Sequence, residues 1–157
     1  GVSHYTGHAK VSTEMADAIM HRLRYGAADI RAVTELVRYH DGVIDETEKA
    51  VKRRLAQLGE KQFFRLVDLK RADNAAQTAD PDFRRDCAEQ LKTIARDIIS
   101  HKDCLSLKNL SVNGSDLLAL GLSGRDIGTA LDSMLNAVID GKVENEKNRL
   151  IEWYFGK

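Results

Sequence analysis

The amino-acid sequence predicts an all-α protein, and three observations support this fold class. Proline occurs once in 157 residues, at Pro81, whereas alanine, leucine and the charged residues that favour helices are abundant. Apolar residues recur at intervals of three and four, which is the period of an amphipathic helix. Glycines and short polar residues mark the expected helix ends. The chain is 43% hydrophobic and 31% charged, so it can bury a core, and neither a disordered tail nor a collagen-like fibre is expected.

Five helices are expected in the first hundred residues. Their approximate ranges are 7–24, 29–40, 45–58, 63–69 and 80–98. Asp29 is expected to cap the second helix. Gly59 is expected to end the third in a left-handed conformation. Pro81 suits the first position of the fifth helix, because a proline lacks the N–H group that would be unpaired there.

Glycines become frequent after His101, and the expected helices become shorter. Three helices are expected, over roughly 116–120, 123–139 and 146–154. Ser123 with Asp126 resembles a capping box, and Asn145 is expected to cap the last helix. The expected core of this tail consists of Leu135, Ile139, Ile151 and Trp153. We therefore predict two domains, a multi-helix bundle over residues 1–100 and a small helical subdomain over residues 101–157.

The cysteine content and the apolar runs indicate the compartment. Cys87 and Cys104 are too few for a disulfide framework in a chain of this length, so a reducing, cytoplasmic compartment is expected. No run of about 18 apolar residues could span a bilayer, and no basic-then-apolar leader opens the sequence, so no membrane partner is expected. Because the sequence starts at Gly1 rather than at a methionine, we expect a fragment of a longer protein.

Common catalytic arrangements are not supported by the residue spacing. Gly114-Ser115 could belong to a nucleotidyl-transfer site, but the one Asp-x-Asp motif, at residues 80–82, precedes it and is explained as a helix start. No glycine-flanked serine supports a hydrolase triad. The two cysteines lack the spacing of zinc ligands. We therefore assign no catalytic residue.

A divalent metal site is one candidate that the sequence leaves open. His4 and His8 are four residues apart, the spacing that places two imidazoles on one helical face. A site of His8, His40 and Asp73 would gather nitrogen and carboxylate ligands from three helix ends, and such ligands suit a first-row divalent ion. The simpler interpretation is that His40 and Asp73 cap helices or form hydrogen bonds.

Positive charge is concentrated between residues 47 and 71, although 24 basic and 24 acidic residues give the whole chain a net charge of zero. In that segment eight lysines and arginines face three acidic residues, a local surplus of +5. Such a surplus suits contacts with phosphate, and a solvated helix face is the alternative. The candidate RNA-binding residues of this segment are Lys49, Lys52, Arg53, Arg54 and Arg65.

A second candidate for phosphate binding is the glycine-rich helix start at Gly124 and Arg125. The N-terminus of a helix presents unpaired N–H groups that can hold a phosphate, and Arg125 stands beside them. The alternative is that Gly128 lets two helices approach closely, with Asp126 already filling the anion position.

Two groups of motifs occur in order along the chain. The first consists of Gly7-His8-Ala9, Met15-Ala16, residues 21–25, Leu36-Val37 and His40-Asp41. The second consists of residues 114–121, 124–128, Leu131 and 145–147. The first group resembles the HD-type segment that follows the nucleotidyltransferase head in bacterial CCA-adding enzymes, the tRNA nucleotidyltransferases. The second resembles the C-terminal RNA-binding region of the same family, and its glycines, leucines and asparagine make it the more specific half.

The resemblance implies an HD-like helical bundle and an RNA-binding tail without the polymerising head of the enzyme. The head would bind Mg²⁺ and CTP or ATP, so this fragment is expected to hold no such cofactor and to be inactive alone in nucleotide addition. Its partners would be that head and tRNA, whose acceptor and TΨC arm it would hold through contacts to the backbone and to the shape of the duplex. His8, His40 and Asp73 are, by resemblance, a partial HD ligand set for a divalent metal.

Two other functions are weighed against tRNA binding. The first is a metal-dependent HD-type phosphohydrolase that acts on phosphomonoester or cyclic-nucleotide ends. An earlier histidine and a His-Asp dyad upstream of Gly1 would be needed for it, and His40-Asp41 aligns with a later histidine position. The second is a structural dimerisation module, and homodimer formation is left open.

Overall fold

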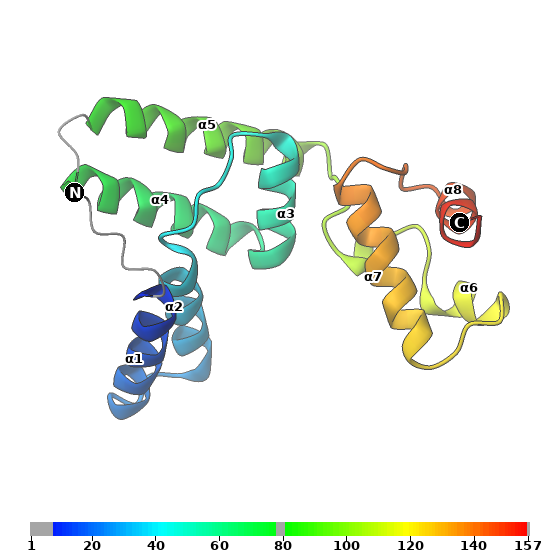
Figure 1. Ribbon diagram of the computed structural model, residues 1–157, viewed down its shortest axis with the longest axis horizontal. Coiled ribbons are helices and arrows are strands. Elements are labelled where there is room, and N and C mark those ends of the chain that lie inside the picture. The colour runs from blue at the N-terminus through cyan, green and yellow to red at the C-terminus, as the bar shows by residue number, and fades with distance from the viewer. Residues whose placement is uncertain (1–7, 78–80, 157) are drawn as a thin grey trace. The chain divides into compact units, whose positions relative to one another are not determined.

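The computed structural model describes residues 8–77 and 81–156 (Figure 1), and in these ranges it contains eight α-helices and a short 3-10 helix but no strand. The all-α prediction is confirmed. The elements are α1 (His8–Arg22), α2 (Ala27–Tyr39), α3 (Glu48–Leu58), α4 (Glu60–Gln77), α5 (Pro81–Ser100), η1 (Leu107–Asn109), α6 (Gly114–Ala119), α7 (Arg125–Ile139) and α8 (Lys147–Phe155). No helix in the described part of the chain is long and apolar enough to cross a membrane.

The chain packs into two compact units. The first unit combines residues 1–46 and 58–93, and the second combines residues 47–57 and 94–157. Most of α3 therefore belongs with the tail of the chain, although it lies in the first hundred residues. The domain division at residue 100 stays a prediction.

In the first unit, α1 and α2 form a helical hairpin (Figure 1). Helix α1 ends in a Schellman motif, in which Tyr25 N–H donates to Met20 O at 3.1 Å and Arg24 adopts a left-handed φ of 59°. This tight reversal lets α2 begin at Ala27, with Gly26 as its N-cap. Asp29 lies in the first turn of α2, so the predicted cap at Asp29 is wrong. The turn between α1 and α2 ends earlier than the apolar pattern indicates, so the N-cap of α2 is Gly26 and not Asp29.

Helix α4 and residues 81–93 of α5 complete the first unit, whereas the rest of α5 belongs to the second. Helix α4 is longer than the predicted 63–69 segment, because residues 70–77 are mostly good helix formers although they carry no apolar stripe. Its Phe63, Leu66 and Val67 side chains are buried. Ion pairs join α4 to α5, among them those from Lys92 to Asp68 at 2.7 Å and from Arg71 to Glu89 at 3.7 Å.

The second unit has its own apolar core. The buried residues of this core are Cys104, Leu110, Val112, Leu117, Ala130, Met134 and Leu150. Leu135 and Ile151 pack against it, as predicted for the tail. Ile139 is buried outside this cluster, and Trp153 is half-buried and also outside it. Leu150, three positions before Trp153, occupies the central place in α8 and is fully buried.

The helix caps of the second unit differ from those predicted. The capping box lies at α6, where the Asn113 side chain accepts from the Asp116 N–H and the Asp116 carboxylate accepts from the Asn113 N–H. Helix α7 instead begins after Gly124 without a side-chain cap, so the box predicted at Ser123 and Asp126 is wrong. Helix α8 has Glu146 as its N-cap, so the predicted cap at Asn145 is also wrong.

Asn145 has a different structural role. Its Oδ1 accepts from Ser111 N–H at 2.9 Å, and its Nδ2 donates to Asn109 O at 2.8 Å. Its own main-chain oxygen accepts from Ser111 Oγ at 2.7 Å. Asn145 therefore ties the start of α8 to the end of η1 and to the residues that follow it.

Candidate nucleic-acid interface

Helix α3 presents the first group of predicted RNA-binding residues. Thr47 Oγ1 accepts from the Ala50 N–H at 3.3 Å and so supports the helix start. Val51 and Leu55, four residues apart, are buried at 0% and 3% exposure. The helical period then leaves Lys49 and Arg53, themselves four residues apart, on a more exposed face of α3.

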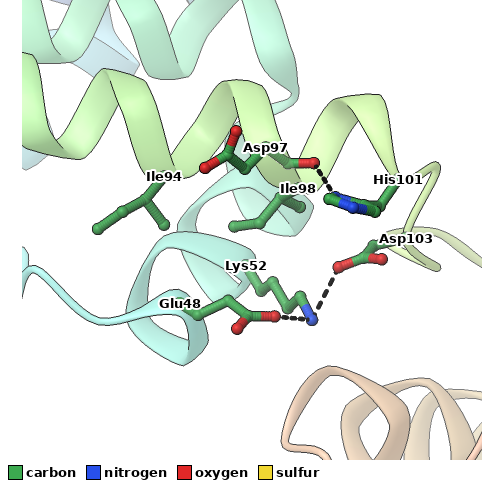
Figure 2. Close-up of a pocket in the computed structure, with 7 residues that line it drawn as sticks. All are labelled: Glu48, Lys52, Ile94, Asp97, Ile98, His101 and Asp103. Carbon is green, nitrogen blue, oxygen red and sulfur yellow. Dashed lines mark hydrogen bonds and ion pairs between the residues drawn. The ribbon is translucent and has the colours of Figure 1, made fainter.

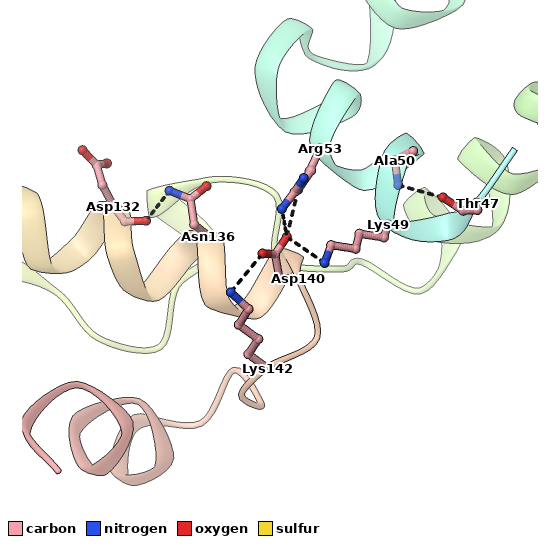
Figure 3. Close-up of polar contacts among 8 residues, drawn as sticks. All are labelled: Thr47, Lys49, Ala50, Arg53, Asp132, Asn136, Asp140 and Lys142. Atoms are coloured by element: carbon pink, nitrogen blue, oxygen red, sulfur yellow. Dashed lines mark hydrogen bonds and ion pairs between the residues drawn. The ribbon is translucent and has the colours of Figure 1, made fainter. Parts of the chain in front are cut away.

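A single carboxylate, that of Asp140, gathers three cations (Figure 3). Arg53 donates to Asp140 Oδ1 through Nη2 at 2.6 Å and through Nε at 2.8 Å. Lys49 Nζ lies 3.7 Å from the same oxygen, and Lys142 Nζ lies 3.4 Å from Oδ2. We call these four residues the Asp140 cluster, and all of them belong to the second unit.

The Asp140 cluster carries a surplus of positive charge, three cations against one carboxylate. Burial would raise the pKa of Asp140, but the hydrogen bond from Arg53, followed by the attraction of Arg53 and Lys49, outweighs it and lowers that pKa. The Asp140 side chain is only 9% exposed, whereas those of Lys49, Arg53 and Lys142 are 51%, 59% and 60% exposed. Asp140 is also the C-cap of α7, where the helix dipole disfavours a negative charge and favours the nearby cations.

Lys52 has a different environment from its neighbours on α3 (Figure 2). Its ammonium pairs with Glu48 Oε1 at 2.5 Å and with Asp103 Oδ2 at 2.7 Å, and its side chain is 21% exposed. Burial would lower the pKa of Lys52, but the hydrogen bonds to Asp103 and Glu48 outweigh it, and the pKa is raised. Lys52 therefore stays charged and is matched by two acids.

The same residues line a pocket of about 470 Å³ in the second unit. Ile94 and Ile98 contribute apolar surface, and Glu48, Lys52, Asp97, His101 and Asp103 contribute polar groups. The His101 ring donates through Nδ1 to the Asp97 main-chain oxygen at 2.7 Å (Figure 2). With three carboxylates and one ammonium, this pocket is unsuited to a phosphate.

The other predicted contacts lie on different elements. Arg54 donates to Gln57 Oε1 at 3.0 Å on α3, and Arg65 donates to Gln62 Oε1 at 3.2 Å on α4. Arg65 belongs to the first unit. The Arg125 guanidinium, at the start of α7, is exposed and has no hydrogen-bond or ion-pair partner among the described residues.

The glycines at the start of α7 have free space beside their Cα atoms. Gly124 has φ 55° and ψ −126°, a conformation that favours glycine, and a Cβ built there would meet nothing within 4 Å. A Cβ at Gly128 would also meet nothing within 4 Å, so close approach of two helices does not explain Gly128. Gly114, by contrast, would bring a Cβ to 3.5 Å from the Ile127 side chain.

The three predicted metal ligands are only partly described. The side chain of His8 lies outside the described residues. His40 Nδ1 donates to Val37 O at 2.6 Å, and Asp73 lies on α4. Among the side chains that the structure describes, no group of three His, Cys, Asp or Glu residues is placed to hold a metal ion. The metal set stays a prediction.

Sequence reasoning did not identify Asp140 and Lys142 as members of the basic surface. The available local signal was Gly141, whose left-handed φ of 69° ends α7 and lets Lys142 N–H donate to Ala137 O at 2.9 Å. This turn brings the Lys142 side chain back to the end of α7. The pairing of Asp140 with Arg53 joins residues 87 positions apart, which no local pattern indicates.

Comparison with known proteins gives one match. Residues 4–154 match the family model described as "tRNA nucleotidyltransferase domain 2 putative". Searches of curated proteins and of solved structures each find no match.

Proposed function

Because the chain belongs to the tRNA nucleotidyltransferase domain 2 family, we propose that it binds the acceptor and TΨC arm of tRNA in the cytoplasm. In this proposal it presents the 3′ end to a nucleotidyltransferase head that adds C, C and A. The observation that carries the proposal is the family match over residues 4–154, nearly the whole chain. The chain then serves as the RNA-binding part of a CCA-adding enzyme of bacterial type.

The chemistry of tRNA recognition supports a basic surface rather than a base-reading pocket. An enzyme that acts on all tRNAs needs contacts to phosphates and 2′-hydroxyls, because a duplex of RNA hides base edges in a deep groove. The proposed contacts are Lys49, Arg53, Arg54, Arg65, Gly124 and Arg125. Lys52, which the sequence also predicted, is left out because Glu48 and Asp103 already pair with it. The surplus charge of the Asp140 cluster and the Arg125 guanidinium, which has no partner among the described residues, support part of this set.

Nucleotide addition itself is assigned to the head. Gly114 and Ser115 form the first turn of α6, and Asp116 accepts from the Asn113 N–H and pairs with Lys147 Nζ at 2.5 Å. The Lys147 hydrogen bond, followed by that from Asn113, lowers the pKa of Asp116. The Asp116 carboxylate therefore has a structural role. Mg²⁺ and CTP or ATP belong to the head in this proposal.

The test is a binding titration of the chain with tRNA that lacks its CCA end and with a single-stranded RNA of equal length. We expect tighter binding to tRNA and similar affinity for different tRNAs. Log affinity should fall linearly with log salt, with a slope of roughly −0.9 per phosphate contact on a duplex. Equal affinity for both RNAs, or no binding at low salt, would remove the proposal.

A matched pair of double variants tests the basic surface. Replacing Arg53 and Arg54 by alanine should reduce the salt slope by up to about two and weaken binding to different tRNAs alike. Replacing the same residues by lysine keeps both charges and should retain most of the slope. An alanine variant with the wild-type slope would contradict these contacts.

A further inference from the structure

We propose that the Asp140 cluster is a phosphate-binding site for two neighbouring phosphates of an RNA strand, with Lys142 as a contact residue and Asp140 as the positioning residue. This inference rests on the proposed function and names the part of the chain that contacts the RNA backbone. Of the basic residues on α3, the proposed site includes Lys49 and Arg53 and excludes Lys52.

The Asp140 cluster leaves most of its hydrogen-bond donors available to a ligand. A guanidinium has five N–H groups, and Arg53 directs its Nε and one Nη2 donor to Asp140. The other three N–H groups of Arg53 have no acceptor in the part of the chain that the structure describes and are left for a ligand. Each lysine ammonium has three N–H groups, and Lys49 and Lys142 each approach a single Asp140 oxygen. Phosphate oxygens are acceptors of the kind that such donors bind most strongly.

The carboxylate and the cations of the cluster differ in exposure to solvent. The carboxylate that holds the cations is 9% exposed, whereas all three cationic side chains are at least half exposed. The Asp140 carboxylate is therefore mostly shielded from solvent, whereas the side chains of Lys49, Arg53 and Lys142 reach it. Figure 3 shows Lys49 and Arg53 coming from α3 and Lys142 coming from the turn after α7, so that they approach Asp140 from different sides. A ligand in solvent meets positive charge here.

The charges within the Asp140 cluster do not cancel. Three cations and one carboxylate leave a net charge of +2, which two phosphodiesters of charge −1 each would neutralise. Lys52 lies on the same helix, but with Glu48 and Asp103 it forms a group of net charge −1. Attraction for phosphate is therefore confined to one part of α3, and Lys52 is a structural link between α3 and the segment after α5.

The role of Asp140 follows from the same distances. Without a carboxylate between them, the three cations would repel one another and lose a common orientation. With it, the Arg53 guanidinium is held by two donors on one oxygen before any RNA binds. Such preorganisation reduces the side-chain entropy that binding would otherwise cost.

The experiment compares Lys142→Ala, Lys142→Arg and Lys52→Ala with the wild type in tRNA titrations over a range of salt. The Lys142 side chain is 60% exposed, and the turn at this position depends on its main-chain N–H. Lys142→Ala should therefore keep the wild-type melting temperature and lower the salt slope by about one. At 0.1 M salt one contact contributes about 0.9 log units, so affinity should fall about eightfold. Lys142→Arg should restore both quantities.

Lys52→Ala is the contrasting variant on the same helix. It should lower the melting temperature, because it leaves Glu48 and Asp103 without their partner, and it should leave the salt slope of the folded protein unchanged. If Lys52→Ala does not fold, the comparison of Lys142→Ala with Lys142→Arg still decides. A Lys142→Ala protein with the wild-type slope, or a folded Lys52→Ala protein that loses as much slope, would overturn the site while wild-type binding to tRNA stands. Failure of the wild type to prefer tRNA would instead overturn the proposed function.

Discussion

Replacing Asn145 by alanine should destabilise the second unit without changing any apolar contact. The variant removes the two side-chain hydrogen bonds, from Ser111 N–H at 2.9 Å and to Asn109 O at 2.8 Å. The third bond, from Ser111 Oγ to the Asn145 main-chain oxygen, is retained because the backbone is unchanged. The loss therefore reports on the amide group alone.

The magnitude follows from the number and setting of these bonds. A hydrogen bond of this kind contributes about 0.5–1.5 kcal/mol to stability. Ser111 and Asn109 are exposed, so water can partly replace the lost partner and the lower half of that range applies. Two bonds then give a loss of about 1–2 kcal/mol in the free energy of unfolding. For a chain of 157 residues this lowers the melting temperature by about 3–6 °C.

Thermal unfolding followed by circular dichroism measures this loss, and Asn148→Ala is the matched control. Asn148 lies in the first turn of α8 and is exposed, and its side chain has no hydrogen-bond partner among the described residues. Its replacement should be neutral or slightly stabilising, because alanine has the higher helix propensity. Asn145→Asp should recover at most the bond to Ser111, since a carboxylate cannot donate to Asn109 O. Equal melting temperatures for Asn145→Ala and Asn148→Ala would refute the reasoning.

Two further predictions concern charge and backbone conformation. The pKa of Asp140 is lowered in the folded state, so its contribution to stability is complete above the ordinary aspartate value of about 3.9 and is lost as pH falls through the lowered value. Asp140→Asn should therefore cost at most about 1 kcal/mol in urea unfolding at pH 7, because solvent screens ion pairs with such exposed cations, and progressively less at more acidic pH. A loss independent of pH would point to packing instead. Gly124→Ala should destabilise by about 1 kcal/mol because of the φ of 55°, whereas Gly128→Ala, inside α7 with free space around its Cβ, should stabilise by up to about 1 kcal/mol. The same sign for both alanine variants in urea unfolding would contradict this explanation.

The sequence predicted the helices well because their apolar stripes are local. In α7, Leu131 and Leu135 recur at helical spacing, and both pack against the core of the second unit. The end of α4 was missed for the opposite reason. Its apolar residues stop at Leu69, and the helix continues to Gln77 through polar residues and alanines. Helix propensity extends the element beyond the part that the hydrophobic pattern marks.

Caps were harder to predict than helices, because a capping residue has more than one use. Asn113 and Asn145 are both asparagines just before a helix, and either could cap it. Asn113 does so, and its partner Asp116 is three residues away. Asn145 instead bonds residues 34 and 36 positions earlier in the chain. The choice depends on which backbone groups the fold brings near, and the sequence around each residue does not contain that information.

The basic surface shows the same dependence on tertiary structure. A count of charges between residues 47 and 71 gives a surplus of +5, and in that count Lys52 and Arg53 each contribute one positive charge. In the folded chain Lys52 meets Asp103, 51 positions on, and is neutralised, whereas Arg53 meets an acid that two other cations share. Adjacent residues thus acquire opposite local charge balances from partners in distant segments. A phosphate would bind near Arg53 and not near Lys52, although a count of charges in the sequence treats the two residues alike. For this reason the comparison of Lys142 with Lys52 is a sharper test of RNA binding than removal of the whole basic segment.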